Sequence, residues 1–197
     1  MNIYFSALAL FLVMDPVGNI PIFLSLLRKL PRKRRFYIII RELFFALILL
    51  LLFLLFGNHI MSIMQITRPA LSISGGVILA FVAVKMIFTA TNIQSFDLMK
   101  NHEPFLVPLA IPLIAGPGAL AIVVLWTASD PLNTASYFYS VVLAWAATAV
   151  ILITSDFLRE IISKKLLNAL EKLMGMILIT ISVQMILDGI TMYLKSL

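Results

Sequence analysis

The chain contains no cysteine and only two histidines, His59 and His102. Without cysteine there can be no disulfide, no thiol catalysis and no cysteine-ligated metal centre. The two histidines stand far apart in the sequence, and neither an HExxH zinc motif nor a GxxxxGK[ST] phosphate-binding loop is present. We therefore expect a protein that is not an enzyme and that holds no metal and no other cofactor.

Charged residues are also scarce. Asp, Glu, Lys and Arg make up 12% of the 197 residues, whereas a soluble domain carries about 25%. Apolar residues make up 62%, which is more than a soluble fold of this size can cover with polar surface. Lipid must therefore solvate much of the surface, and we expect residues 1–197 to form a single integral membrane domain.

Six apolar stretches are long enough to cross a bilayer, which takes about 20 helical residues. They cover residues 3–27, 43–64, 69–90, 104–127, 136–154 and 173–193. Each run is continuous and does not alternate, so six transmembrane helices are expected and not barrel strands. The segments 28–41 and 91–103 are expected to be loops, and 156–172 a charged amphipathic connector. The first stretch lacks the basic start and the cleavage site of a signal peptide, so it is expected to stay in the protein.

The basic residues predict an orientation. With segment 28–41 on the cytoplasmic side, twelve of the 15 Lys and Arg residues fall on that side. They are Arg28, Lys29, Arg32, Lys33, Arg34, Arg35, Arg41, Lys100, Arg159, Lys164, Lys165 and Lys172. The positive-inside rule then predicts that both termini face outward. The formal charge of +6 is thus a topology signal, and we expect the lipid bilayer as a partner and not nucleic acid.

The third and sixth stretches resemble each other. Residues 76–87 align with residues 175–186 at an offset of 99, and six of the twelve positions are identical. Chance similarity between apolar helices is the simpler alternative. A repeat unit of three helices has an odd number, so its second copy must cross the membrane upside down. We therefore predict two inverted three-helix repeats, at about residues 3–90 and 104–193, an arrangement of many secondary transporters.

Each repeat is expected to break its first helix near mid-membrane. The Asp-Pro-Val-Gly-Asn motif at 15–19 lies roughly 18 Å from the outer start of the first stretch, and the Gly-Pro-Gly motif at 116–118 lies at a similar depth in the fourth. Broken helix ends at that depth survive where they line a cavity or are packed in protein. Their freed groups suit a small zwitterion. The predicted binding residues are Asp15, Pro16, Gly18, Asn19, Gly116, Pro117 and Gly118. The alternative is a proline kink at which Asp15 only bonds neighbouring backbone.

Other polar or small residues in the spans are secondary candidates. They are Gly75, Gly76, Lys85, Gln184 and Asp188. Close helix packing explains the two glycines equally well, Lys85 can extend to the interface, and Asp188 is near a hydrated helix end. Glu42 with Arg41 is expected to form an interfacial ion pair.

Several of these motifs together resemble the MarC family. The similarity rests on residues 15–23, Arg41-Glu42, Ser74-Gly-Gly76, residues 107–117 and residues 184–189, and it extends over essentially the whole chain. The resemblance implies a bacterial inner-membrane protein with six spans. The family name reflects an association with multiple antibiotic resistance that does not imply a drug pump. An archaeal relative is regarded as a neutral amino-acid transporter.

Taken together, these features favour a secondary transporter of small neutral amino acids or similar zwitterions that works by alternating access around a central pocket. A proton or a sodium ion is the expected kind of coupling ion. The alternatives are a channel or exporter for another small solute and a non-transporting membrane scaffold or assembly protein. Assembly into an oligomer is compatible with each of them.

Overall fold

The computed structural model describes residues 2–27, 30–88, 114–155 and 164–196. The described helices are α1 (Ile3–Met14), α2 (Pro16–Leu26), α3 (Arg32–Ile63), α4 (Arg68–Phe88), α5 (Pro117–Ser129), the short 3-10 helix η3 (Pro131–Asn133), α6 (Thr134–Ile153) and α8 (Lys164–Leu194). No β-strand occurs within these ranges, so the all-helical class is confirmed for them. The predicted loop 91–103 and residues 104–113 of the fourth stretch lie outside the described residues.

Five stretches are long and apolar enough to cross a membrane. They are Ile3–Ile20, Arg32–Ile63, Arg68–Phe88, Pro131–Ile153 and Asn168–Leu194. Large apolar side chains on them are exposed, including Phe5, Leu55, Phe81 and Val150, which are all more than 60% exposed. Contiguous apolar surface of this kind fits contact with lipid. Five of the six predicted spans are therefore present, and the 13-residue α5 forms the second part of the predicted fourth.

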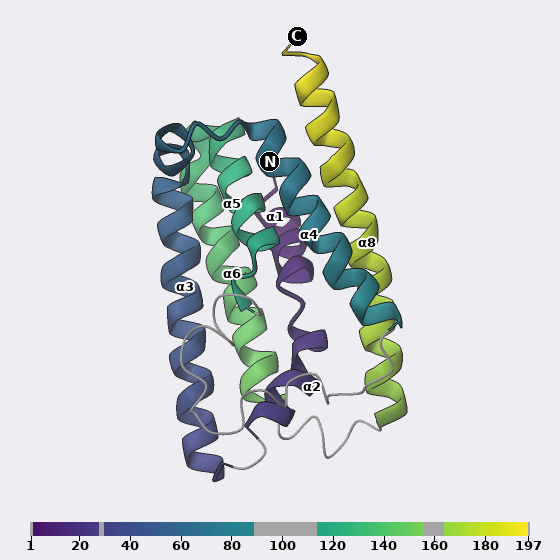
Figure 1. The fold of residues 1–197 in the computed structure, drawn as a ribbon. Helices are drawn as coiled ribbons and strands as arrows, with labels where there is room; N and C mark the ends of the chain where they lie inside the picture. Colours follow the sequence, from purple (N-terminus) through teal and green to yellow (C-terminus); the bar gives the residue numbers. More distant parts are fainter. Residues whose placement is uncertain (1, 28–29, 89–113, 156–163, 197) are drawn as a thin grey trace.

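α1 and α2 run in succession through the middle of the bundle (Figure 1). Both contact α6 and both contact α8, so they lie between these two helices. α3 packs on α5 and α6, while α4 packs on α5 and, most extensively, on α8. The bundle thus has a flank of α3, α5 and α6, a central broken element, and a flank formed by the antiparallel α4–α8 pair.

Glycines bring α4 and α8 close together. A Cβ atom at Gly76 of α4 would lie 2.8 Å from the carbonyl oxygen of Ser182 and 2.8 Å from Ile186 Cγ1. A Cβ atom at Gly175 of α8 would lie 3.2 Å from the carbonyl oxygen of Ala83 and 2.9 Å from a side-chain carbon of α4. Small residues that let backbones approach closely are the usual contact between helices in lipid.

The predicted basic loop at 28–41 is largely helix, which corrects the sequence-based boundary. α3 begins at Arg32, after an extended Pro31 at the N-cap, and α8 begins at Lys164, inside the predicted connector. Arg and Lys are good helix formers, so a charged segment marks the edge of the hydrocarbon and not the end of a helix. Both helices continue beyond their apolar spans.

Candidate functional site

The first break is a single residue, Asp15, between α1 and α2. Its backbone is left-handed, with φ 43° and ψ 60°. Asp is one of the few residue types other than glycine that visits this region readily. The Asp15 N–H donates to the carbonyl oxygens of Phe11 at 3.1 Å and Leu12 at 3.2 Å, which closes the last turn of α1. The chain therefore stops one helix and starts the next within one residue.

The side chains of the motif satisfy the backbone groups that the break frees. Asp15 Oδ1 accepts a hydrogen bond from the Gly18 N–H at 3.1 Å, which is the N-cap interaction of α2. Asn19 Nδ2 donates to the Met14 carbonyl oxygen at 3.0 Å, at the end of α1. Pro16 occupies the first position of α2, where its missing N–H costs nothing. Residues 16–19 form the first turn of α2, so the predicted helix break is confined to Asp15.

The first break is packed inside the protein. Asp15 is 6% exposed and Asn19 is 7% exposed. A Cβ atom at Gly18 would collide with the Asp15 carboxylate and would lie 2.6 Å from Met86 Cε of α4. Glycine is required there because the capping carboxylate and the methionine already occupy the space.

The predicted second break lies at the start of α5, and residues 104–113 before it lie outside the described residues. Gly116 is its extended N-cap residue, with φ −61° and ψ 161°, and Pro117 follows at the first helical position. No side chain caps this helix N-terminus. Ile114 and Ala115, which precede it, are fully buried, and α5 begins part-way along the bundle (Figure 1). A Cβ atom at Gly118 would lie 2.5 Å from Leu79 Cγ and Cδ2 of α4.

Both breaks therefore pack on the same helix. Met86 contacts the position of Gly18, and Leu79 contacts the position of Gly118. These two side chains are seven residues apart on α4, which corresponds to two turns and about 10 Å. The sequence motifs located the break at Asp15 and the helix start at Pro117, but they gave no sign of Leu79 or Met86, because apolar residues in a transmembrane helix carry no distinguishing pattern.

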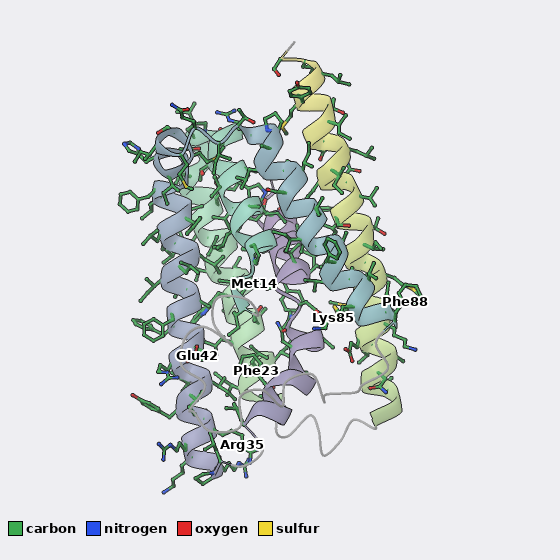
Figure 2. The ribbon with its side chains drawn as sticks, viewed as in Figure 1. Met14, Phe23, Arg35, Glu42, Lys85 and Phe88 are labelled. Carbon is green, nitrogen blue, oxygen red and sulfur yellow. The ribbon has the colours of Figure 1, made fainter. Side chains whose placement is uncertain are left out.

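The secondary candidates divide into two groups. Gly75 and Gly76 are buried and face neighbouring helices, with a Cβ at Gly75 lying 2.8 Å from Ala121 Cβ, so they serve close packing. Lys85, Gln184 and Asp188 are exposed, and Gln184 Nε2 donates to Asp188 Oδ1 at 2.8 Å. Lys85 precedes Met86 on α4 and is labelled beside the start of α2 in Figure 2, whereas Gln184 and Asp188 lie together on α8.

Glu42 was expected in an interfacial ion pair and proves to be fully buried. Its Oε1 accepts hydrogen bonds from Arg41 Nη2 at 2.7 Å and from Arg41 Nε at 3.0 Å. The side chain of Glu42 is 0% exposed. The ion pair is confirmed, but the carboxylate lies in the protein interior. Within the described residues, no group of three or more Asp, Glu or His is placed to hold a metal ion.

These features define a polytopic α-helical membrane protein in which one helix breaks at Asp15 and another begins inside the bundle at Pro117. The chain belongs to the MarC family, since the family described as "MarC family integral membrane protein" matches residues 1–194. The sequence-based resemblance is thereby confirmed.

Two relatives illustrate the similarity. The chain is 44% identical over 190 residues to the "UPF0056 inner membrane protein YhgN" of Escherichia coli (strain K12), with 96% of each chain covered. It is 46% identical over 183 residues to a "UPF0056 membrane protein" of Buchnera aphidicola subsp. Baizongia pistaciae (strain Bp), with 92% of each chain covered. No solved structure matches the chain.

Proposed function

We propose that this protein is a secondary transporter of small neutral amino acids or similar small zwitterions in the bacterial inner membrane. It works by alternating access around a central pocket between the two breaks. One observation carries the proposal: two helices begin inside the bundle, at Pro16 and Pro117, and both starts pack on one face of α4. A scaffold has no need of two matched helix starts in its interior.

The chemistry at the two starts suits the two ends of a zwitterion. The N-terminus of α5 has no side-chain cap, so the N–H groups of Gly118 and Ala119 and the helix dipole favour a carboxylate. The Asp15 carboxylate uses Oδ1 for the Gly18 N–H, and its charge favours an ammonium group. Met86 and Leu79 fill the space at Gly18 and Gly118, so their displacement would free room only for small solutes such as glycine, alanine and serine.

Repeat symmetry supports the transporter architecture. Gly76 packs on Ser182 and Ile186, and Gly175 packs on Ala83 and Ile87. Residues 182 and 186 stand 99 positions after residues 83 and 87, the same offset that relates the two glycines. Equivalent contacts are thus exchanged between α4 and α8, as expected for two inverted repeats related by a twofold axis between these helices. The complete set of six spans, with repeats at about 3–90 and 104–193, is part of this proposal.

The contacts between helices suggest that the α4–α8 pair moves relative to the rest of the bundle. The α4–α8 pair is held together along its whole seam, and it contacts the rest of the bundle through α5, α1 and α2. A shift of this pair moves Leu79 away from Gly118 or Met86 away from Gly18. Each movement exposes one break, which is what alternating access requires.

The test is counterflow of labelled alanine, glycine and serine in proteoliposomes, with lysine and glutamate as charged control solutes. We expect exchange of the three neutral amino acids and none of the charged ones. Asp15→Asn keeps an N-cap acceptor but loses the charge, so exchange should fall about tenfold or more, the equivalent of one charge-assisted contact. Asp130→Asn, which alters a carboxylate at the end of α5, is the matched control and should exchange normally. Absence of counterflow in the wild-type protein would refute the proposal.

A further inference from the structure

The interior of the bundle contains a second carboxylate that the proposed binding site does not use. Glu42 of α3 is 0% exposed. Arg41 binds only one of its oxygens, Oε1, at 2.7 Å and 3.0 Å. The other oxygen, Oε2, is buried and accepts no hydrogen bond from the described residues. A buried carboxylate oxygen without a donor is rare in proteins and calls for a functional explanation.

The ion pair has an unusual geometry for a purely structural contact. Adjacent residues on a helix point in different directions, and stabilising pairs are normally three or four residues apart. Arg41 must therefore fold round the helix to reach Glu42. The arginine side chain remains 22% exposed while the glutamate is fully enclosed. One partner of the pair thus reaches the surface and the other does not.

Among the described residues, the helices packed on α3 bring no charged side chain toward Glu42. The helices packed on α3 are α5 and α6, and neither contains Asp, Glu, Lys, Arg or His; the only titratable side chains of α6 are Tyr137 and Tyr139, near its far end. Trp145 of α6 donates its Nε1–H to the Leu43 carbonyl oxygen at 2.8 Å, which fixes α6 beside this part of α3. On α3 itself, Arg35 lies two turns away. Within the part of the chain that the structure describes, Arg41 is therefore the ionic partner of the carboxylate.

The position of Glu42 suits the transfer of a proton between the cytoplasmic end of the bundle and the helix break at Asp15. In Figure 2 it lies on α3 between Arg35, near the basic end of the helix, and the level of Met14, which ends α1. The helix α2 spans the same part of the bundle (Figure 1).

We propose that Glu42 carries the proton that couples transport; this inference rests on the proposed function. When Arg41 turns outward, its two hydrogen bonds to Oε1 break and a proton from water forms an O–H bond at Oε2, which leaves a neutral carboxyl in the interior. When Arg41 returns after the bundle has opened to the opposite side, the proton leaves to water on that side and the ion pair forms again. One free oxygen is enough to bind a proton, and neutralisation removes the cost of a buried charge that has lost its partner.

The experiment compares gradient-driven accumulation with counterflow in proteoliposomes. For one proton per solute, wild-type protein should accumulate alanine about tenfold per unit of imposed pH gradient. Glu42→Gln should lose this accumulation and equilibrate alanine only, while it keeps counterflow. Glu42→Asp, which retains a carboxyl group, should accumulate alanine, and Asp130→Asn should behave as wild type. Accumulation by Glu42→Gln, or accumulation driven by a sodium gradient and not by a pH gradient, would overturn the inference while leaving the proposed function intact.

A second readout does not depend on transport. Infrared difference spectra of the purified protein between acid and alkaline pH should contain the C=O bands of the protonated carboxyls, which shift in D₂O. One of these bands should vanish in Glu42→Gln and persist in Asp130→Asn. Spectra of Glu42→Gln in which every band persists would refute protonation of this residue. If the wild-type protein shows no counterflow at all, the proposed function fails, and the band alone then decides whether Glu42 takes up a proton.

Discussion

At the scale of single residues, Asp15 combines two roles that separate residues usually fill. Its left-handed backbone ends α1, and its side chain caps α2. Only a residue that tolerates positive φ and also carries a short acceptor can fill both roles, which limits the choice to Asp and Asn. The following proline prepares the helical φ of the next turn. Asp15 and the proline that follows it therefore account for the helix break.

A substitution series at Asp15 tests this dual role. Asp15→Asn should unfold at nearly the wild-type temperature, because Asn caps helices and visits the left-handed region. Asp15→Gly keeps the backbone but loses the cap, and Asp15→Ala loses both, at a total of about 1–3 kcal/mol. Thermal unfolding of the detergent-solubilised variants should give the order Asn, Gly, Ala from most to least stable. Equal stability of the Ala and Asn variants would show that the cap does not matter.

At the scale of elements, the sequence was informative about which segments are helices and where the first one breaks. Hydrophobic runs near the length of a bilayer indicate spans, and the Asp-Pro and Gly-Pro-Gly motifs indicate helix starts. The predicted start of α3 was wrong, because its basic first turns were predicted to be a loop. It also could not reveal that Leu79 and Met86 cover the breaks, because the contacts between helices depend on their mutual register and not on any local pattern.

The contact between α4 and α5 yields a prediction of compensation. At Gly118, the atoms nearest to an added Cβ all belong to the Leu79 side chain. Gly118→Ala should destabilise the protein by about 1–3 kcal/mol through overpacking, and Leu79→Ala should restore part of that loss in the double variant. At Gly18 the Asp15 carboxylate also blocks a Cβ, so Met86→Ala should not rescue Gly18→Ala.

Thermal unfolding of the single and double variants measures this compensation as a coupling energy. Additive effects at Gly118 and Leu79 would contradict the contact. Rescue of Gly18→Ala by Met86→Ala would show that the carboxylate can move aside.

At the scale of the whole molecule, both termini lie at the same end of the bundle, opposite the labelled Arg35 (Figures 1 and 2). The basic N-terminal turns of α3 lie at that opposite end. The positive-inside rule therefore predicts that Asn2 and Lys195 are periplasmic and that Lys33 is cytoplasmic.

Cysteine labelling can test this orientation directly, because the chain has no cysteine of its own. In intact spheroplasts, a membrane-impermeant maleimide should label Asn2→Cys and Lys195→Cys. It should label Lys33→Cys only after the membrane is permeabilised. The reverse pattern would invert the orientation, and labelling of one terminus alone would mean an odd number of spans.

The placement of Leu79 and Met86 on one straight helix has a mechanical consequence. A rigid helix that tilts about a point between two side chains moves them in opposite directions. Because the two side chains are about 10 Å apart, a tilt of about 15° moves each by about 1 Å, one toward its glycine and the other away. A tilt that exposes one helix start therefore covers the other. In the transport cycle that we propose, the stiffness of α4 would therefore keep the two helix starts from being open at the same time.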